Sequence, residues 1–414
     1  MRCWKFITMF FLLPSSLLAN RIVVGPHQTI KKIKQAIAIA KSGDTLLVNP
    51  GYYAEGNIIV DKKLYVKGID LPVIDGEKKY EIFSIKANGV QLEGFKLIHS
   101  GVSNLDDYAG IKVYDSRDVT IQNNILDDTY FGIYLQYAKK CTIKNNQMRA
   151  YFKEEQQSGN GIHCWKSDSI LIINNRINGH RDGIYFEFVM HSIIKNNFSE
   201  HNIRYGLHFM YSNDDKYLAN EFFANGAGVA VMYSHGVHMY QNIFRENWGD
   251  AAYGLLLKEI SDSEIKGNSF LKNTSGIYME GVTRVKVSGN QFVNNGWAMK
   301  IQASCMEVNV VQNNFMGNTF DVGTNGSLVL NTFQNNYWDK YDGYDINKDN
   351  IGDVPYRPVS MYSMIVEKNP PAMMLFRSFI TALLDRTEKI IPSLTPINLV
   401  DKFPVMKKYI YKLT

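Results

Sequence analysis

Side chains that can bind soft metal ions recur at matching positions of a short repeated sequence motif, which we call the phrase. His208 and Met210 stand two residues apart in Gly-Leu-His-Phe-Met, and Met232 ends the next phrase, Gly-Val-Ala-Val-Met. His163 and Glu187 occupy the corresponding places in the two preceding phrases. An imidazole with two thioethers suits copper, and Cu(I) especially, better than calcium or magnesium. These five residues are therefore our candidate copper ligands. Outward methionines also suit a hydrophobic patch that docks a partner protein, and the two uses can coincide.

A second candidate metal site lies in an acidic segment near the C-terminus, residues 341–358 (YDGYDINKDNIGDVPYRP). Hard oxygen ligands stand there at alternate positions: Asp345, Asn347, Asp349 and Asp353. This spacing is typical of the first half of a calcium loop. However, Asn350 takes the place of the turn glycine, and no glutamate closes the loop. The alternative is a turn held by hydrogen bonds from Asx side chains to the backbone.

The other histidines and methionines are weaker candidates. Three of them follow the Met232 phrase closely: His235, His238 and Met239. Three more are expected to be surface or turn residues: His180, Met190 and His191.

An enzyme would need clustered carboxylates, or a carboxylate-bound cation with a basic side chain. Asp182, Glu187 and Glu280 are predicted to face outward. Glu187 and Glu280 are four repeats apart, roughly 19 Å if neighbouring strands stack at the usual spacing. The sequence therefore offers no catalytic pair, and we predict that the protein is not an enzyme.

The phrase that carries these residues begins with Gly or Ala and repeats with a period near 22 residues, as from Gly110 to Gly132 and from Gly254 to Gly276. A fixed period of this size indicates stacked supersecondary units. The residues that directly follow the initial Gly or Ala of each phrase form the first column. They are always apolar: Ile111, Ile133, Ile162, Ile184, Leu207, Val229, Leu255, Ile277 and Met299. Because side chains alternate along a strand, this column and the third should point inward. The second column should point outward: Lys112, Tyr134, His163, Tyr185, His208, Ala230, Leu256, Tyr278 and Lys300.

An asparagine keeps the same period as the phrase. Its positions are Asn124, Asn146, Asn175, Asn197, Asn220, Asn242, Asn268, Asn290, Asn314 and Asn336. We expect these side chains to stack at a turn, each bonding the backbone or the next asparagine. The role of this column is therefore structural.

Short strands without a helical pattern between them predict an all-β protein, a parallel β-helix. Such a coil needs a cap at each end. Residues 29–41 form an amphipathic N-terminal capping helix. The Met-rich residues 373–384 form a short C-terminal helix, which either lies on a membrane or partner, as a peripheral contact, or caps the last coil. We divide the chain into a signal peptide (1–19), a cap with first coils (20–109), regular coils (110–340), and an acidic loop, short helix and extended tail (341–414).

The N-terminus predicts export. Arg2 and Lys5 precede an apolar run, and Ala19 is a plausible cleavage position.

The net charge is +5, and no Lys/Arg cluster with interleaved aromatics indicates nucleic acid. Three cysteines outside the signal, Cys141, Cys164 and Cys305, fit no paired metal spacing, and Cys164 falls in an inward column.

The ordered set of phrases resembles the NosD family of periplasmic β-helix proteins, which act in nitrous oxide reductase maturation. The stretches that carry the resemblance are GNGIHCW (159–165), GHRDGIYFEFV (179–189), RYGLHFMYSND (204–214), AGVAVMYS (227–234), YGLLLKEISDSEIKGNSF (253–270), GIYMEG (276–281), NGWAMKIQASC (295–305), NTFDVGTNGS (318–327) and NNYWDKYDGYDINKDNIGDVPYRPVS (335–360). The resemblance covers the chain from about residue 110 to residue 360.

This resemblance implies a right-handed β-helix in the periplasm. It also implies partnership with an ABC transporter made of an ATPase and a membrane subunit, a copper-chaperone lipoprotein as donor, and delivery toward the copper centres of nitrous oxide reductase. It does not assign copper ligands. Two functions remain open: a non-catalytic maturation factor that passes copper or a sulfur species, and an exported carbohydrate-binding or polysaccharide-modifying β-helix protein.

Overall fold

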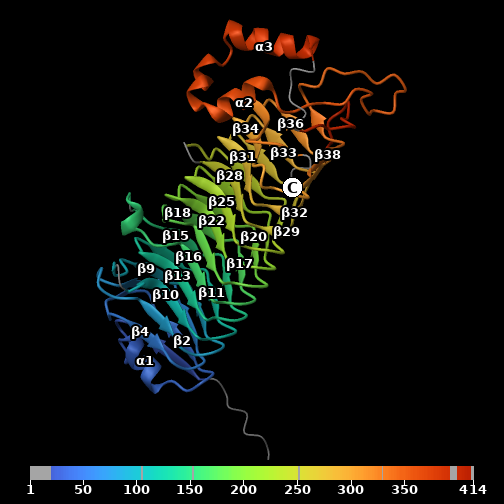
Figure 1. The fold of residues 1–414 in the computed structure, drawn as a ribbon. Coiled ribbons are helices and arrows are strands. Elements are labelled where there is room, and N and C mark those ends of the chain that lie inside the picture. Colours follow the sequence, from blue (N-terminus) through green and yellow to red (C-terminus); the bar gives the residue numbers. More distant parts are fainter. Residues whose placement is uncertain are drawn as a thin grey trace, which may run out of the picture.

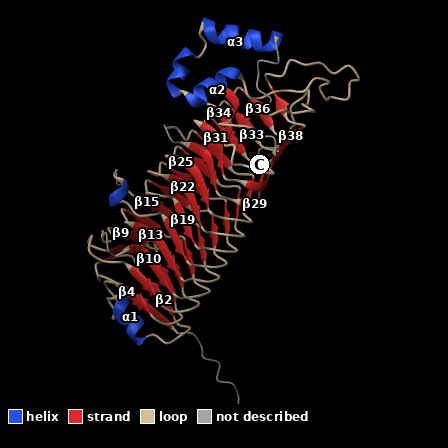
Figure 2. Ribbon diagram, viewed as in Figure 1, coloured by secondary structure: helices blue, strands red, loops and turns tan. Residues whose placement is uncertain are grey.

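The chain winds into a right-handed parallel β-helix, as predicted (Figure 1). The computed structural model describes residues 20–103, 106–151, 153–249, 252–328, 330–391 and 399–411. The predicted signal, residues 1–19, lies outside the described residues. Each coil adds one strand to each of three parallel sheets, so that strands fill the rod and helices stand mainly at its ends (Figure 2).

Among the described residues, the first sheet has 14 strands and the second and third have 13 and 12. The strands of the first sheet are β1 (Arg21–Val24), β2 (Thr45–Val48), β5 (Tyr65–Gly68), β8 (Gln91–Glu93), β11 (Thr120–Gln122), β14 (Thr142–Lys144), β17 (Leu171–Ile173), β20 (Ile193–Lys195), β23 (Lys216–Leu218), β26 (His238–Tyr240), β29 (Ser261–Lys266), β32 (Thr283–Ser288), β35 (Asn309–Val311) and β38 (Thr332–Gln334). Those of the second are β3 (Tyr52–Tyr53), β6 (Val73–Asp75), β9 (Lys96–Ile98), β12 (Ile125–Asp127), β15 (Gln147–Arg149), β18 (Arg176–Asn178), β21 (Phe198–Glu200), β24 (Glu221–Phe223), β27 (Ile243–Arg245), β30 (Ser269–Leu271), β33 (Gln291–Val293), β36 (Asn314–Met316) and β39 (Tyr337–Trp338).

The repeated phrase forms the third sheet. Its strands are β4 (Ile58–Val60), β7 (Phe83–Ile85), β10 (Ala109–Tyr114), β13 (Phe131–Gln136), β16 (Ile162–Trp165), β19 (Ile184–Glu187), β22 (Tyr205–Met210), β25 (Ala227–Met232), β28 (Tyr253–Lys258), β31 (Ser275–Glu280), β34 (Trp297–Ile301) and β37 (Phe320–Gly323). The first and third columns from β10 to β34, Cys164 included, are fully buried, which confirms their inward direction. Inside the second sheet, aromatic rings stack from Phe222 through Phe244 to Phe270 with centroids 5.5 and 4.7 Å apart.

The asparagine column forms a continuous buried ladder, as predicted. The Asn220 amide nitrogen Nδ2 donates to the Oδ1 atom of Asn242 at 3.0 Å and to the carbonyl of Ile194 at 2.9 Å. One member was assigned wrongly. The rung after Asn290 is Asn313, whose Oδ1 accepts from the Asn290 backbone nitrogen at 2.9 Å. Asn314 instead bonds the backbone of Tyr409, since it points to the opposite side of the strand.

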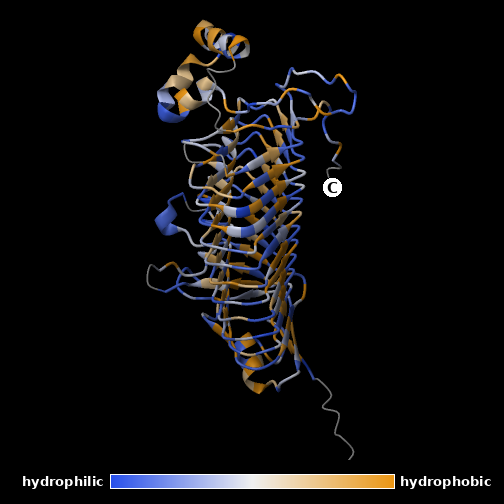
Figure 3. Cartoon of the chain, turned by 45° about the vertical axis from the view of Figure 1, so that its right-hand side comes forward, coloured by the Kyte–Doolittle hydropathy of each residue, from blue (hydrophilic) through white to orange (hydrophobic). Residues whose placement is uncertain are grey.

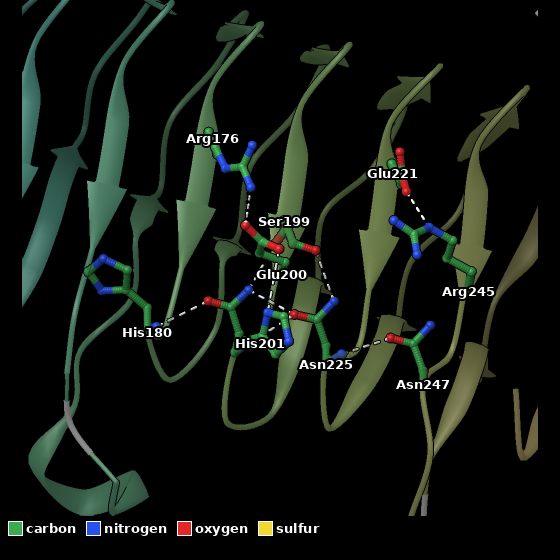
Figure 4. Close-up of polar contacts among 10 residues, drawn as sticks. Arg176, His180, Ser199, Glu200, His201, Glu221, Asn225, Arg245 and Asn247 are labelled. Carbon is green, nitrogen blue, oxygen red and sulfur yellow. Dashed lines mark hydrogen bonds and ion pairs between the residues drawn. The ribbon is translucent and has the colours of Figure 1, made fainter.

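A second ladder, which the sequence analysis missed, lies at the turn between the second and third sheets. It runs through Asn202, Asn225, Asn247, Asn273, Asn295 and Asn318. His180 stands at its N-terminal end, where its backbone nitrogen donates to the Oδ1 atom of Asn202 at 3.1 Å. Figure 4 shows this end of the ladder beside two ion pairs on the second sheet, Arg176 with Glu200 and Arg245 with Glu221.

The N-terminal cap is α1 (Ile33–Ile39), which is shorter than the predicted 29–41. Ile30 forms a β-bridge with Val24, so the helix begins after it. Ile33, Ala36 and Ile37 are buried against the core at the open end of the coil. The predicted capping role is thus confirmed by packing.

The C-terminal helices differ from the single predicted helix over 373–384. The C-terminal cap is α2 (Met361–Lys368), and the Ser360 side chain caps its N-terminus. Its Tyr362 and Val366 pack against Trp297 and Phe320. The Met-rich segment follows as a 3-10 helix, η2 (Pro370–Leu375), and then as α3 (Phe379–Ile390). Figure 3 shows α2 and α3 above the coil with many hydrophobic residues on them.

Part of the predicted extended tail folds back onto the last coils. Asp401 is fully buried and accepts hydrogen bonds from the Nδ2 atom of Asn336 (3.1 Å) and the indole Nε1 of Trp338 (3.0 Å). Val405 forms a bridge with Tyr337. A carboxylate from far along the chain therefore ends the asparagine ladder. Residues 392–398 and 412–414 of the tail lie outside the described residues.

Candidate metal centre on the third sheet

The candidate copper ligands lie on the outer face of four successive strands of the third sheet, β16, β19, β22 and β25. Glu187, Met210 and Met232 are direct register partners in turn. His208 shares β22 with Met210. His163 is paired with Tyr185, and Tyr185 with His208. The coils therefore bring four of the residues into one neighbourhood.

His163 stands apart from the other four. One whole strand separates it from His208, which corresponds to about 10 Å at the usual spacing between strands. Bonds from copper to its ligands are about 2 Å long, so two ligands of one ion lie within about 4 Å of each other. The ring of Tyr185 lies between the two imidazoles, 4.9 Å from each, so His163 and His208 do not meet at one ion in this arrangement.

The second column was predicted to point outward, and it does face away from the core, but its middle part is buried from solvent. His163 is 9% exposed and His208 only 4%. Tilted and edge-to-face ring contacts run along the column, with centroid distances of 4.3 Å from Tyr134 to His163 and 4.9 Å from Tyr185 to His208. The first residue of β22 adds cover, since the ring of Tyr205 lies 4.8 Å from that of His208. The column faces away from the core, yet its own aromatic neighbours bury it.

The Nδ1 atom of His208 meets a buried charged pair. It lies 3.4 Å from Nη2 of Arg204 and 3.6 Å from Oδ2 of Asp182. Arg204 in turn pairs with Asp182 at 3.3 Å and with Glu155, in the 149–159 insertion, at 2.8 Å. The Nε2 atom of His208 is buried without a hydrogen-bond partner in the described structure. Because a guanidinium can only donate, Nδ1 of His208 accepts from Arg204, and Asp182 lies just beyond hydrogen-bond distance. For Nε2 to bind a metal, the ring proton would have to move to Nδ1, where Asp182 is the nearby acceptor.

His163 has a different environment. Its Nδ1 lies 3.1 Å from Nδ2 of Asn160, and the ring of Phe131 lies 5.4 Å away. Burial, with the charges of Arg181 and Lys112, lowers the pKa of His163 to about 3. This imidazole is therefore neutral at every physiological pH, and it fills an aromatic cage.

Tyr185 connects His208 with Met210. Its ring contacts the imidazole, and its hydroxyl lies 3.6 Å from the Sδ atom of Met210. Burial raises the pKa of Tyr185 to about 12, so the phenol keeps its proton. On the other side, the register partner of His208 is Ala230. The side chain of Ala230 is only a methyl group, whereas the matching residue on the next strand is Leu256.

The carboxylates predicted to face outward are not arranged for catalysis. Asp182 is fully buried, which corrects the prediction, because it is paired with Arg204. Glu280 is four strands from Glu187 by register and lies 3.5 Å from Lys258.

The weaker candidates take ordinary places, with one exception. Met190 and His191 are exposed as predicted, and His191 pairs with Asp168 at 2.9 Å. Met239 is a core residue, and His238 contacts the hydroxyl of Tyr240. His180 lies in a turn, one of the two places expected for it, and is fully buried there. Burial lowers its pKa to about 4, although the backbone of Gly159 and Tyr130 opposes this.

The acidic loop forms Asx turns, which was the alternative to calcium. The carboxylate of Asp345 accepts from the backbone nitrogens of Asp349 (3.2 Å) and Asn350 (2.9 Å). Asp353 accepts from Ile346, and the side chain of Asn347 bonds Asp349. Asn350 has a φ of +68°, which asparagine tolerates better than most residues. These oxygens are used by the loop itself, and calcium has no support here.

Within the described ranges, no three His, Cys, Asp or Glu side chains gather as a metal cluster. A copper site on this face therefore depends on thioethers. The Arg204–Asp182 pair beside His208 was not predicted from the sequence. A signal was present, since Arg-Asp-Gly (181–183) and Arg-Tyr-Gly (204–206) precede successive phrases.

Three parallel sheets wound as one coil define the parallel β-helix class of proteins. The catalytic domain of a GH87 α-1,3-glucanase, solved with tetrasaccharides, is similar with a TM-score of 0.58 and 11% identity, over 77% of this chain and 69% of that one. At this identity the likeness concerns the fold alone.

The chain belongs to the NosD family. The model of the family described as "Periplasmic copper-binding protein (NosD)" matches residues 55–153 and 148–351. A relative from Pseudomonas aeruginosa, named probable ABC transporter binding protein NosD, is 25% identical over 86% of this chain and 87% of its own length. A relative of the same name from Stutzerimonas stutzeri is 23% identical over 92% of both chains.

Proposed function

We propose that this protein is a non-catalytic accessory factor that receives copper in the periplasm and passes it on, so that the copper centres of nitrous oxide reductase mature. The observation that carries the proposal is the meeting of His208, Met210 and Met232 on one outer face in a chain of a copper-binding family. Residues 1–19 act as the export signal. The separation of Glu187 from Glu280 gives no support to hydrolysis or epimerisation.

His208, Met210 and Met232 are the proposed Cu(I) ligands, with Glu187 beside them. One imidazole nitrogen and two thioethers match the preference of Cu(I) for soft ligands. Asp182 orients His208 through Nδ1, while Tyr185 holds the Met210 sulfur. His163 stiffens the aromatic column and is a structural neighbour of the site.

The partner at the membrane is an ABC transporter, composed of an ATPase and a membrane subunit. The exposed apolar residues of η2 and α3 are the surface for this contact, and they lie beyond the last coil (Figure 1). Met374 and Phe379 are 90% and 80% exposed, and Ile380 and Leu383 about half. None of the helices in the described ranges is long and apolar enough to cross a membrane. A copper-chaperone lipoprotein is the proposed donor.

The test is Cu(I) binding by the purified protein, in competition with a chromophoric chelator of known affinity. We expect His208→Ala with Met210→Ala to abolish tight binding while the circular dichroism spectrum stays unchanged. The matched control is Met190→Ala with His191→Ala, an exposed Met/His pair on the preceding coil. Unchanged copper stoichiometry in the first variant would reject these ligands.

The role in maturation is tested in cells. A strain that carries the His208→Ala, Met210→Ala variant should produce nitrous oxide reductase with little copper and little activity. Reductase with a normal copper content in that strain would contradict the proposed role.

A further inference from the structure

Four aromatic residues lie exposed at the corner where the chain leaves the third sheet. Tyr137, Phe188, Tyr211 and Tyr233 directly follow the last residues of β13, β19, β22 and β25, and they are 39–44% exposed. Met190, two residues after Phe188, is 39% exposed. We call these five residues the aromatic corner.

The backbone at these four aromatic positions disfavours bulky residues. Their φ angles are between +51° and +53°. In this left-handed region a Cβ crowds the backbone, so Gly and Asn are the usual occupants. Other coils place Asp115, Lys166 or Glu259 at this corner, also with positive φ. Among the described residues other than glycine with positive φ, all Phe, Tyr and Trp residues lie in the aromatic corner. Neither backbone preference nor core packing explains aromatic side chains here.

Three of the four rings form a stack, and its middle ring, Tyr211, presents its edge to solvent. Phe188 and Tyr211 stack at 5.2 Å with an interplanar angle of 8°, and Tyr211 and Tyr233 at 5.1 Å with 16°. Each stacked face is covered by the neighbouring ring. A sugar or a base that stacks needs a free ring face. A ridge of ring edges instead fits an apolar groove on a protein, and Tyr is common at the centres of such interfaces.

The ridge adjoins the proposed copper ligands. Tyr211 follows Met210 in the chain, and Tyr233 follows Met232. When copper passes directly between two proteins, ligands of both must reach the same ion, whose bonds are about 2 Å long. The partner surface must therefore contact the residues around Met210 and Met232. We propose that the aromatic corner docks the protein that exchanges Cu(I) with this site; this inference rests on the proposed function.

The partner chemistry follows from the two surfaces. The docking protein carries Cu(I) on soft ligands near its own surface and surrounds them with an apolar groove. No net oxidation or proton release is needed, because one set of neutral ligands replaces another around the same ion.

Two experiments on the mature full-length protein test this inference. First, Tyr211 is replaced in cells by a photo-reactive phenylalanine analogue, and the cross-linked product is identified. We expect a protein that binds Cu(I) when purified. Second, the rate of Cu(I) transfer from that protein is measured for the Phe188→Asn, Tyr211→Asn, Tyr233→Asn variant. Asn suits the left-handed backbone, so the fold should be retained, and we expect at least a tenfold slower transfer with Cu(I) affinity within twofold of wild type.

Lys166→Asn with Glu259→Asn is the matched control, because both residues occupy the same corner with positive φ. This variant should transfer copper at the wild-type rate. Equal transfer by the triple variant would overturn the inference, as would cross-linking only to a second copy of this chain, to lipid or to a protein without copper. A wild-type protein that binds no Cu(I) would overturn the proposed function itself, which the affinity measurement shows separately.

Discussion

At the scale of single residues, the chemistry of a buried histidine depends on what its Nδ1 atom meets. His208 has a buried carboxylate near Nδ1, whereas His163 has a carboxamide. The carboxylate of Asp182 is itself held by Arg204, so its direction is fixed. For this reason we expect His208, of two histidines that the sequence pattern treats as equivalent, to be the copper ligand.

The same contact predicts a positioning role for Asp182. We expect Asp182→Asn to weaken Cu(I) binding at His208 by about 10-fold, the low end for the loss of a partner behind a metal ligand. The measurement is chelator competition, together with the NMR shifts of the His208 ring nitrogens, which report the tautomer. Glu280→Asn, on the same sheet face, is the control. Unaltered affinity and unaltered shifts would show that Asp182 only supports the fold.

His180 predicts a dependence of stability on pH. Its pKa is about 4 in the folded protein, below its ordinary value of 6.5, because burial disfavours the charged form. Between these values the unfolded chain binds a proton that the folded chain does not. The resulting stability is present above pH 6.5 and is lost as the pH falls toward 4, and it amounts to on the order of 3 kcal/mol.

Urea unfolding at a series of pH values measures this loss. His180→Asn should reduce the dependence, since Asn continues the second ladder without a titrating group. His191→Asn, at an exposed position where Asp168 raises the histidine pKa, should leave the loss between pH 6.5 and 4 in place. Identical pH slopes for His180→Asn and wild type would contradict this assignment.

At the scale of elements, the asparagine ladder links each coil to the next. The Oδ1 atom of Asn220 accepts from the backbone nitrogen and the amide of Asn197, while its own amide bonds Asn242 and Ile194. Asn220→Ala leaves several of these buried groups without partners. Each such group costs about 1–3 kcal/mol, so we expect a loss of about 3 kcal/mol in the free energy of unfolding.

The measurement is urea unfolding of the purified protein. The control is Asn196→Gly, an exposed position with a φ of +55°, where glycine keeps the turn. A loss of less than about 1 kcal/mol for Asn220→Ala would mean that water replaces the ladder bonds there.

The sequence predicted those elements whose pattern is local and periodic. Alternation along the phrase placed Ile162 and Cys164 inward, and the 22-residue period placed Met210 beside Met232. The burial of His208 could not be predicted, because alternation along the strand gives the direction of a side chain but not how far the ring of Tyr205, at the start of the same strand, covers it. The exchange of Asn313 for Asn314 has another origin, since adjacent asparagines leave the register ambiguous by one residue.

The helix boundaries and packing at the C-terminal end could not be predicted from local sequence patterns. Helix α2 caps the coil because its Tyr362 meets Trp297 and Phe320, residues at least 42 positions earlier in the chain. The predicted helix over 373–384 was divided into η2 and α3, with Arg377 at a φ of +61° between them. Around such a break between two helices, the sequence pattern predicts an apolar segment but not where each helix begins and ends.

At the scale of the whole molecule, the coil separates two surfaces. The candidate copper site lies on its flank, while the exposed apolar residues of α3 lie beyond its C-terminal end (Figure 1). The proposed transporter contact and the proposed copper exchange therefore use different residues and need not compete.

This separation predicts independent effects of mutation. Phe379→Glu with Leu383→Glu should abolish co-purification with the transporter, because two buried charges would replace apolar contacts. Cu(I) affinity should remain within twofold of wild type. Ile346→Glu, at a position that is 76% exposed in the acidic loop, is the control. Co-purification at wild-type yield would exclude α3 as the contact.

The carboxylate of Asp401 has a consequence for biosynthesis. Growth of the chain begins at the end closed by α1, and each new coil can settle on the one before it. Asn336 and Trp338, however, wait for a partner that the ribosome adds 65 and 63 residues later. During that interval the newest strands present free amides and carbonyls, an edge to which foreign strands can attach. Arrival of Asp401 seals this edge and turns a growing stack into a finished one.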